Sequence, residues 1–127
     1  SKKVVEKLIK QYPDINWISP SVSNKEIFKK IKFGVTCYGT VISELAYNNI
    51  LPICCGDNPT ASFNFSIRSR SIIEHEYHIL NYKELLQDYS PDKEEIGKFI
   101  YMHYIHNSKE KLLIDRINIS SDSLKNI

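Results

Sequence analysis

Hydrophobic residues recur at helical spacing at the start of this chain. The apolar positions within residues 4–9 share one face of a helix, lysines occupy the other face, and Pro13 stands beyond the end. This pattern predicts a helix that is already under way at Lys3. In an α/β unit a strand precedes such a helix, and no strand pattern precedes this one, so we expect the chain to be a fragment of a longer protein.

The next segment predicts a short strand and a short helix. The run INWIS, residues 15–19, is rich in residues that favour strands and is stopped by Pro20. Ser23 and Glu26 then form an S-x-x-E capping box, which is typical of a helix start.

Two continuous apolar runs in the middle of the chain, residues 33–37 and 51–55, indicate buried strands. Between them Gly39-Thr40 breaks the first run, and an apolar stripe at helical spacing over residues 41–46 predicts a helix that ends near Asn48-Asn49. Strand, helix and strand in this order predict a parallel sheet covered on both faces. We therefore expect an α/β fold.

The composition changes after the second strand. Residues 56–71 are rich in Asn, Ser, Thr, Pro and Arg, which predicts a long irregular loop of the kind that is often functional. The pattern of residues 72–80 does not distinguish helix from strand.

Two further helices are predicted towards the end of the chain. Asn81 with Glu84 indicates a short capped helix, and Ser90-Pro91 opens a longer one that runs to about His106. We expect one folded domain over residues 1–106 and a polar C-terminal tail, partly helical or disordered, over residues 107–127.

The composition fits a soluble, folded domain, with 42% hydrophobic and 25% charged residues. Seventeen basic residues against fifteen acidic ones give a net charge of +2, which is too small a surplus to indicate a nucleic-acid partner. No apolar run reaches the roughly 18 residues of a membrane span, and no export signal opens the chain. We expect a cytoplasmic protein.

The cysteines Cys37, Cys54 and Cys55 all lie within apolar runs. Their odd count and their spacing argue against a disulfide framework, and the absence of a CxxC spacer argues against a metal or redox pair. We expect reduced thiols that pack as small hydrophobic residues.

The residues after the first apolar strand have a pattern that suits a ligand. Gly39-Thr40 lies where a parallel strand turns into a helix, which is a typical place for a phosphate or diphosphate. Glu44 follows one helical turn later on the same face, where its carboxylate could accept hydrogen bonds from vicinal hydroxyls of a ribose or sugar. The alternative stays open that Gly-Thr is an ordinary helix cap and that Glu44 complements the helix dipole.

The string G-T-x-x-x-E-x-x-x-x-x-x-P, formed by Gly39, Thr40, Glu44 and Pro52 and followed by Gly56, resembles the donor-binding half of GT-B glycosyltransferases. Within that group it looks most similar to transferases of bacterial capsular or surface polysaccharide biosynthesis. The resemblance runs from about residue 4 to residue 106. It implies a Rossmann-like three-layer α/β/α domain with a parallel sheet, which is one half of a GT-B fold.

The resemblance also implies which ligand the chain binds and which residues bind it. A nucleotide sugar would be the substrate, with its diphosphate near Gly39-Thr40 and its hydroxyl groups near Glu44. The full set of donor-binding residues implied is Tyr38, Gly39, Thr40, Glu44, Gly56, Asp57, Asn58 and Thr60. Neither a metal nor another cofactor is implied, since helix N-termini and basic side chains can stabilise a departing diphosphate.

In such enzymes the acceptor and the catalytic base come from the N-terminal domain, so the resemblance assigns no catalytic residue to these 127 residues and predicts no turnover by this chain alone. It is compatible with peripheral association of the full-length protein with the inner face of the cytoplasmic membrane.

Two groups of side chains have weaker patterns. Arg68 and Arg70 lie in a serine-rich strip and could contact a phosphate, although a solvated loop surface explains them as well. The histidine pair 103/106 has a spacing that would permit metal ligation but no acidic or cysteine partner nearby in the sequence, and His75 and His78 flank Glu76 without a wider cluster, so we expect packed or surface histidines.

Two other functions remain open at this point. One is a nucleotide-sugar epimerase that resembles UDP-N-acetylglucosamine 2-epimerase, although the sequence shows no convincing pair of carboxylates for acid and base. The other is a non-catalytic α/β interaction module.

Overall fold

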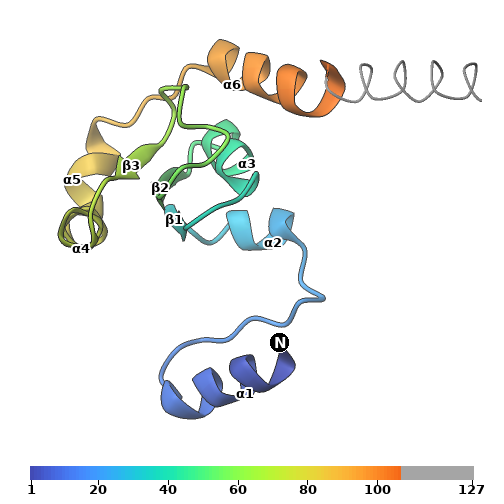
Figure 1. The fold of residues 1–127 in the computed structure, drawn as a ribbon, viewed down its shortest axis with the longest axis vertical. Helices are drawn as coiled ribbons and strands as arrows, with labels where there is room; N and C mark the ends of the chain where they lie inside the picture. The colour runs from blue at the N-terminus through green and yellow to red at the C-terminus, as the bar shows by residue number, and fades with distance from the viewer. Residues whose placement is uncertain (107–127) are drawn as a thin grey trace, which may run out of the picture. The chain divides into compact units, whose positions relative to one another are not determined.

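The computed structural model describes residues 1–106, and the expected tail at residues 107–127 lies outside them. The chain divides into two compact units, Ser1–Lys30 and Ile31–Ile127. Figure 1 labels the elements. They are α1 (Lys2–Gln11), α2 (Asn24–Phe28), β1 (Phe33–Thr36), α3 (Val41–Tyr47), β2 (Leu51–Cys55), β3 (Ile67–Ser69), α4 (Ile72–Leu80), α5 (Tyr82–Gln87), α6 (Lys93–Ile100) and the π-helical turn η1 (Tyr101–His106).

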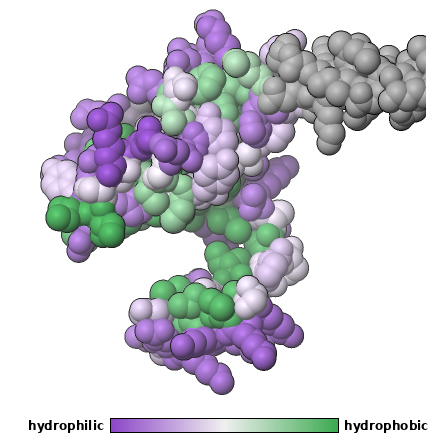
Figure 2. All heavy atoms as spheres, viewed as in Figure 1, coloured by the Kyte–Doolittle hydropathy of each residue, from purple (hydrophilic) through white to green (hydrophobic). Residues whose placement is uncertain are grey.

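The first unit contains the two helices that the sequence predicts. Figure 2 shows α1 with hydrophobic residues on one side and hydrophilic residues on the other. The Ser23 side chain accepts a hydrogen bond from the Glu26 backbone N–H at 3.3 Å, so the predicted helix start of α2 is confirmed. No residue of either helix is buried.

The predicted strand at residues 15–19 is wrong. This segment forms no strand, and all its residues are exposed. A strand needs a neighbouring strand for its backbone hydrogen bonds, and the segment has none among the described residues. Its Trp17 side chain instead donates from Nε1 to the carbonyl oxygen of Tyr12 at 3.1 Å.

The second unit is built on a three-stranded parallel sheet in the order β1-β2-β3. Phe33 pairs with Leu51 and Thr36 with Cys54, and on the other side of β2, Ile53 pairs with Ile67. The predicted strands at residues 33–37 and 51–55, the helix between them and the α/β fold with a parallel sheet are confirmed.

Helices lie against both faces of this sheet (Figure 1). On one face, a Cβ added to Gly34 would come within 2.8 Å of the Leu45 side chain of α3. Cys54 of β2 packs on that same face in a buried cluster with residues of α3 and α6. On the opposite face, the Phe33 ring of β1 stacks on Tyr82 of α5 at 4.3 Å between centroids, and α4 packs against β2 and β3.

The buried core belongs entirely to the second unit. Its buried hydrophobic residues are Ile42, Leu45, Ala46, Ile50, Leu51, Ile53, Cys54, Phe65, Ile96 and Phe99. Burying a large aliphatic or aromatic side chain stabilises a fold by about 1.5–3 kcal/mol. The predicted apolar stripe of the helix after Gly39 is confirmed, because three of these residues come from α3.

Three details of the second half differ from the prediction. Residues 56–71 are not one irregular loop, because β3 lies within them. Asn81 stands at the N-cap position of α5, as predicted, but its side chain makes no capping hydrogen bond; its Nδ2 donates to the Tyr77 carbonyl of α4 instead. The last long helix does not begin at Ser90-Pro91, because α6 is capped by Asp92.

Candidate functional site

All three strands are parallel, so the connections that follow them leave the sheet at one edge. Residues 37–40 follow β1, residues 56–57 follow β2 and residues 70–71 follow β3. In open parallel sheets ligands bind at this carboxyl edge. The fold therefore brings together three of the segments that the sequence analysis selected separately.

The first connection presents Tyr38, Gly39 and Thr40 before α3. Tyr38 is exposed, with 69% of its surface accessible. Thr40 stands at the N-cap position of α3, but its side chain makes no capping hydrogen bond. The Ser43 hydroxyl donates to the Thr40 carbonyl at 2.9 Å instead. The Thr40 hydroxyl is thus not used in the way that a simple capping role would require.

Glu44 lies in the first turn of α3, on the exposed side of the helix. Its neighbours Ser43 and Leu45 are buried. The Glu44 carboxylate makes no hydrogen bond or ion pair with another residue in the described range 1–106. A carboxylate so placed can accept hydrogen bonds from a ligand, and it also complements the helix dipole, so both interpretations of Glu44 remain.

The second connection begins with Gly56, whose φ of +75° favours glycine. Arg68 of β3 donates from Nε to the Gly56 carbonyl oxygen at 3.2 Å, and its guanidinium pairs with the Asp57 carboxylate. Two predicted ligand contacts, Arg68 and Asp57, are therefore bound to each other. Their ion pair fixes the end of β2 against β3.

Asn58 and Thr60, two of the expected donor-binding residues, are buried. The backbone N–H and the hydroxyl of Thr60 both donate to Asn58 Oδ1, which is a local turn interaction. Asn58 Nδ2 is buried and has no hydrogen-bond partner among the described residues. In this structure the two side chains stabilise the connection and do not face an open surface.

The third connection lines a cavity of about 250 Å³ at the carboxyl edge. Arg70 and Ser71 of this connection lie beside it, with His75 from the first turn of α4 and Gly56 from the end of β2. Arg70 is exposed, and the predicted phosphate contact therefore lies where a ligand could reach it.

A hydrogen-bond cluster holds His75 in place. Ser69, only 2% exposed, has its Oγ at 2.9 Å from Nδ1 of His75 and at 2.9 Å from Nδ1 of His78. One hydroxyl proton serves one of these nitrogens, so the other imidazole must donate its own Nδ1 proton to Oγ. This arrangement leaves Nε2 of His75 for a ligand in the cavity, since Nε2 has no partner within residues 1–106.

The sequence analysis did not select His75 or Ser69 for binding. Ser69 ends β3 whereas His75 and His78 lie on α4, so no periodicity within a single element links the three residues. The end of β3 brings the three side chains together, and β3 itself was missed. No signal in the sequence could have identified this cluster.

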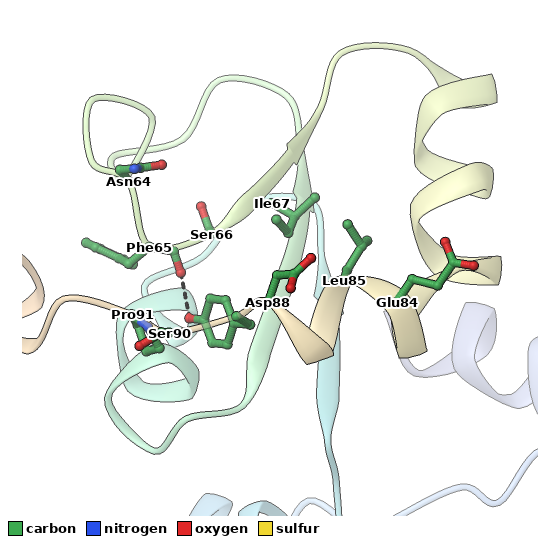
Figure 3. Close-up of a pocket in the computed structure, with 10 residues that line it drawn as sticks. Asn64, Phe65, Ser66, Ile67, Glu84, Leu85, Asp88, Ser90 and Pro91 are labelled. Carbon is green, nitrogen blue, oxygen red and sulfur yellow. Dashed lines mark hydrogen bonds between the residues drawn. The ribbon is translucent and has the colours of Figure 1, made fainter.

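A second cavity, of about 440 Å³, lies at the opposite end of β3 (Figure 3). Ile67, the first residue of β3, lines it together with the carboxylates Glu84 and Asp88. The Tyr89 hydroxyl donates to the Phe65 carbonyl at 2.7 Å beside this cavity. The two carboxylates repel an anion, whereas Arg70 attracts one, so charge favours the smaller cavity for a phosphorylated ligand.

No protein-family model, curated protein or solved structure matches this chain.

Among residues 1–106, no group of three or more His, Cys, Asp or Glu side chains is arranged to hold a metal ion. In the same range, no helix has both the length and the apolar character needed to cross a membrane.

Proposed function

We propose that this chain is the donor-binding domain of a GT-B-type glycosyltransferase of capsular or surface polysaccharide biosynthesis, and that its ligand is a nucleotide sugar. The three-stranded parallel sheet with helices on both faces is compatible with the Rossmann-like domain of such an enzyme. The resemblance over Gly39, Thr40, Glu44 and Pro52 is the ground for proposing this family, and ligands of open parallel sheets bind at the carboxyl edge where Gly39-Thr40 lies.

The observation that carries the proposal is the cavity beside Arg70 and His75. It lies at the edge where the Gly39-Thr40 turn also emerges, and the exposed Arg70 supplies a cation to its lining. Arginine pairs well with phosphate because its planar guanidinium can donate two parallel hydrogen bonds. A diphosphate is the part of a nucleotide sugar that needs such a partner.

Three further residues, Glu44, Arg68 and Asp57, have a role in this proposal. Glu44, without a protein partner in the described range, would accept hydrogen bonds from vicinal hydroxyls of the ribose or the sugar. The ion pair of Arg68 with Asp57 holds the connection at Gly56 in place. Neither of these two side chains needs to touch the ligand.

The lining of the cavity favours a transferase domain over an epimerase. An epimerase carries its own acid and base around the donor, and none of the seven residues that line the cavity is a carboxylate. In the proposed transferase the catalytic base comes from a separate acceptor domain. The protein would act in the cytoplasm, with the full-length enzyme at the membrane where polysaccharide is made.

Calorimetric titration of the full chain with UDP-, GDP- and CMP-sugars tests the proposal. We expect one donor class to bind and its free nucleotide to compete with it. Arg70→Ala should weaken binding about tenfold or more, because a hydrogen bond to a charged group contributes about 1.5–3 kcal/mol. Glu44→Gln should also weaken binding, both of the nucleotide sugar and of its free nucleoside.

The matched controls are Lys83→Ala and Glu76→Gln, which change exposed charges outside the cavity lining. They should leave the affinity unchanged. The proposal is wrong if no donor binds at millimolar concentration to a chain that is folded by circular dichroism. A non-catalytic interaction module would give that result, with Glu44→Gln affecting only stability.

A further inference from the structure

Cys37 and Cys55 lie side by side at the carboxyl ends of β1 and β2. Thr36, the last residue of β1, pairs with Cys54 in the parallel register, so Cys37 directly after β1 and Cys55 at the end of β2 are the next positions of the two chains, and their thiols are hydrogen-bonded. Adjacent strands are about 4.8 Å apart, and disulfides join Cα atoms separated by about 4.4–6.8 Å. Both side chains leave the same face of the sheet, because Val35 and Ile53 two residues earlier are also a register pair.

The two thiols differ in access. Cys37 is exposed, which corrects the expectation that it packs as a small hydrophobic residue, and Cys55 is partly buried. A hydrogen bond with the Cys37 thiol raises the pKa of Cys55, and burial of Cys55 raises it further. Cys37, the more exposed of the two, is therefore the thiol that an oxidant in solution reaches first, and Cys55 is its neighbour.

Cys54 has a different environment although it adjoins Cys55 in sequence. It is 1% exposed and belongs to the hydrophobic cluster on the opposite face of the sheet, where its thiol lies 3.7 Å from the Ser66 hydroxyl. Successive side chains of a strand point to opposite faces, so Cys54 cannot replace Cys55 as the partner of Cys37.

We propose that Cys37 and Cys55 form an oxidation site, at which a hydroperoxide converts the two thiols to an intramolecular disulfide. The Cys37 thiolate attacks the peroxide oxygen, the O–O bond breaks, and the products are a Cys37 sulfenic acid and an alcohol or water. The Cys55 sulfur then attacks the sulfenic sulfur and releases water. Two electrons pass from the two sulfurs to the peroxide, and a thiol reductant reverses the reaction.

The disulfide would have a direct structural effect on the edge of the sheet. It would join the residue before Tyr38-Gly39 to the residue before Gly56, and both connections flank the candidate donor site. Any effect of the disulfide on donor binding rests on the proposed function. The oxidation itself is independent of that function and can be measured without any ligand.

The test is to treat the full chain with hydrogen peroxide and to map the cysteines by mass spectrometry. All three cysteines lie between Lys32 and Arg68 with no lysine or arginine between, so trypsin leaves them on one peptide. Chymotrypsin, which cleaves after Tyr47, separates Cys37 from the other two. We expect a cross-linked pair of chymotryptic peptides, a loss of two alkylatable thiols, and recovery of both with dithiothreitol.

Single substitutions identify which cysteine forms the disulfide with Cys37. Cys54→Ala should still form the cross-link, whereas Cys37→Ser and Cys55→Ser should abolish it. If Cys54→Ala does not fold, fragmentation of the cross-linked peptides from the unsubstituted chain identifies which of the adjacent cysteines is bonded.

The inference is overturned if peroxide links Cys54 to Cys55, if it links Cys37 to Cys54, if it produces only disulfide-bonded dimers, or if all three thiols remain. Failure of the donor titration together with a normal cross-link would reject the proposed function alone.

Discussion

At the scale of single residues, Tyr89 shows how burial changes the chemistry of one group. Its hydroxyl donates to the Phe65 carbonyl at 2.7 Å, just before β3 begins. Burial raises the pKa of Tyr89 above its ordinary value of 10.0, because the charged phenolate is poorly solvated there. The folded chain therefore holds this proton more tightly than the unfolded chain does.

Tyr89→Phe should lower the free energy of unfolding by about 1 kcal/mol, because it leaves the Phe65 carbonyl without its donor. The two proteins should also differ in alkaline solution. Above pH 10 the unfolded state of the original chain loses the Tyr89 proton and the folded state keeps it, so its stability falls with rising pH. The slope from this one group cannot exceed about 1.4 kcal/mol per pH unit.

Urea titrations between pH 8 and about pH 11 would measure both effects. In Tyr89→Phe the alkaline loss of stability should be smaller than in the original chain. Tyr77→Phe is the control, because Tyr77 is exposed and its hydroxyl makes no hydrogen bond with a described residue. An identical alkaline decline in Tyr89→Phe would contradict the assigned role of burial.

At the scale of elements, the start of α6 was predicted two residues too early. The Ser90-Pro91 pair has the composition of a helix start, but the Asp92 carboxylate accepts a hydrogen bond from the Glu94 backbone N–H at 2.9 Å. Both Ser and Asp are good N-cap residues, so composition could not choose between them.

Asp92→Ala should destabilise the protein by about 1 kcal/mol, because it removes the acceptor for a backbone N–H at the helix start and a negative charge next to the helix dipole. Ser90→Ala should change the stability by less than about 0.5 kcal/mol, as exposed substitutions usually do. Denaturant midpoints of the two variants give the comparison. Equal losses would mean that the helix begins earlier than Asp92.

At the scale of the whole molecule, the chain consists of two units with unequal cores. Every buried hydrophobic residue lies in the second unit, and the helices of the first have no buried residue. Folding stability comes mainly from apolar surface removed from water. The second unit should therefore be the one that unfolds cooperatively.

A chain that begins at Ile31 should keep the cooperative unfolding transition, with a loss of less than about 1 kcal/mol, since mutations away from a core have small effects. A chain that begins at Leu51 is the matched control. It lacks β1 and α3, which contribute Ile42, Leu45 and Ala46 to the core, and it should not fold. Circular dichroism during heating would measure both. A large loss of stability on removal of residues 1–30 would contradict this division of the core.

The sequence determined the elements whose signals are local. β2 was predicted to the residue and β1 to within one, because a short apolar run between polar segments is typical of a strand; the predicted burial is confirmed for β2, whereas β1 at the edge of the sheet is only partly buried. α3 followed from its apolar stripe, and the carboxyl edge of the sheet followed from the strand–helix–strand order. The Gly39-Thr40 turn and Glu44 could be selected for the same reason, since their spacing is read within one helical turn.

Tertiary structure decided which distant residues meet. β3 is only three residues long and contains Arg68 and Ser69, so its strand conformation comes from pairing with β2 and not from its composition. That pairing brings Arg68 into an ion pair with Asp57 and Ser69 into hydrogen bonds with His75 and His78. It also brings Arg70 into the lining of the cavity. The neighbouring positions of Cys37 and Cys55 depend in the same way on the register of β1 with β2. Register is the alignment of residues between two paired strands, so it cannot be predicted from one segment of the sequence alone.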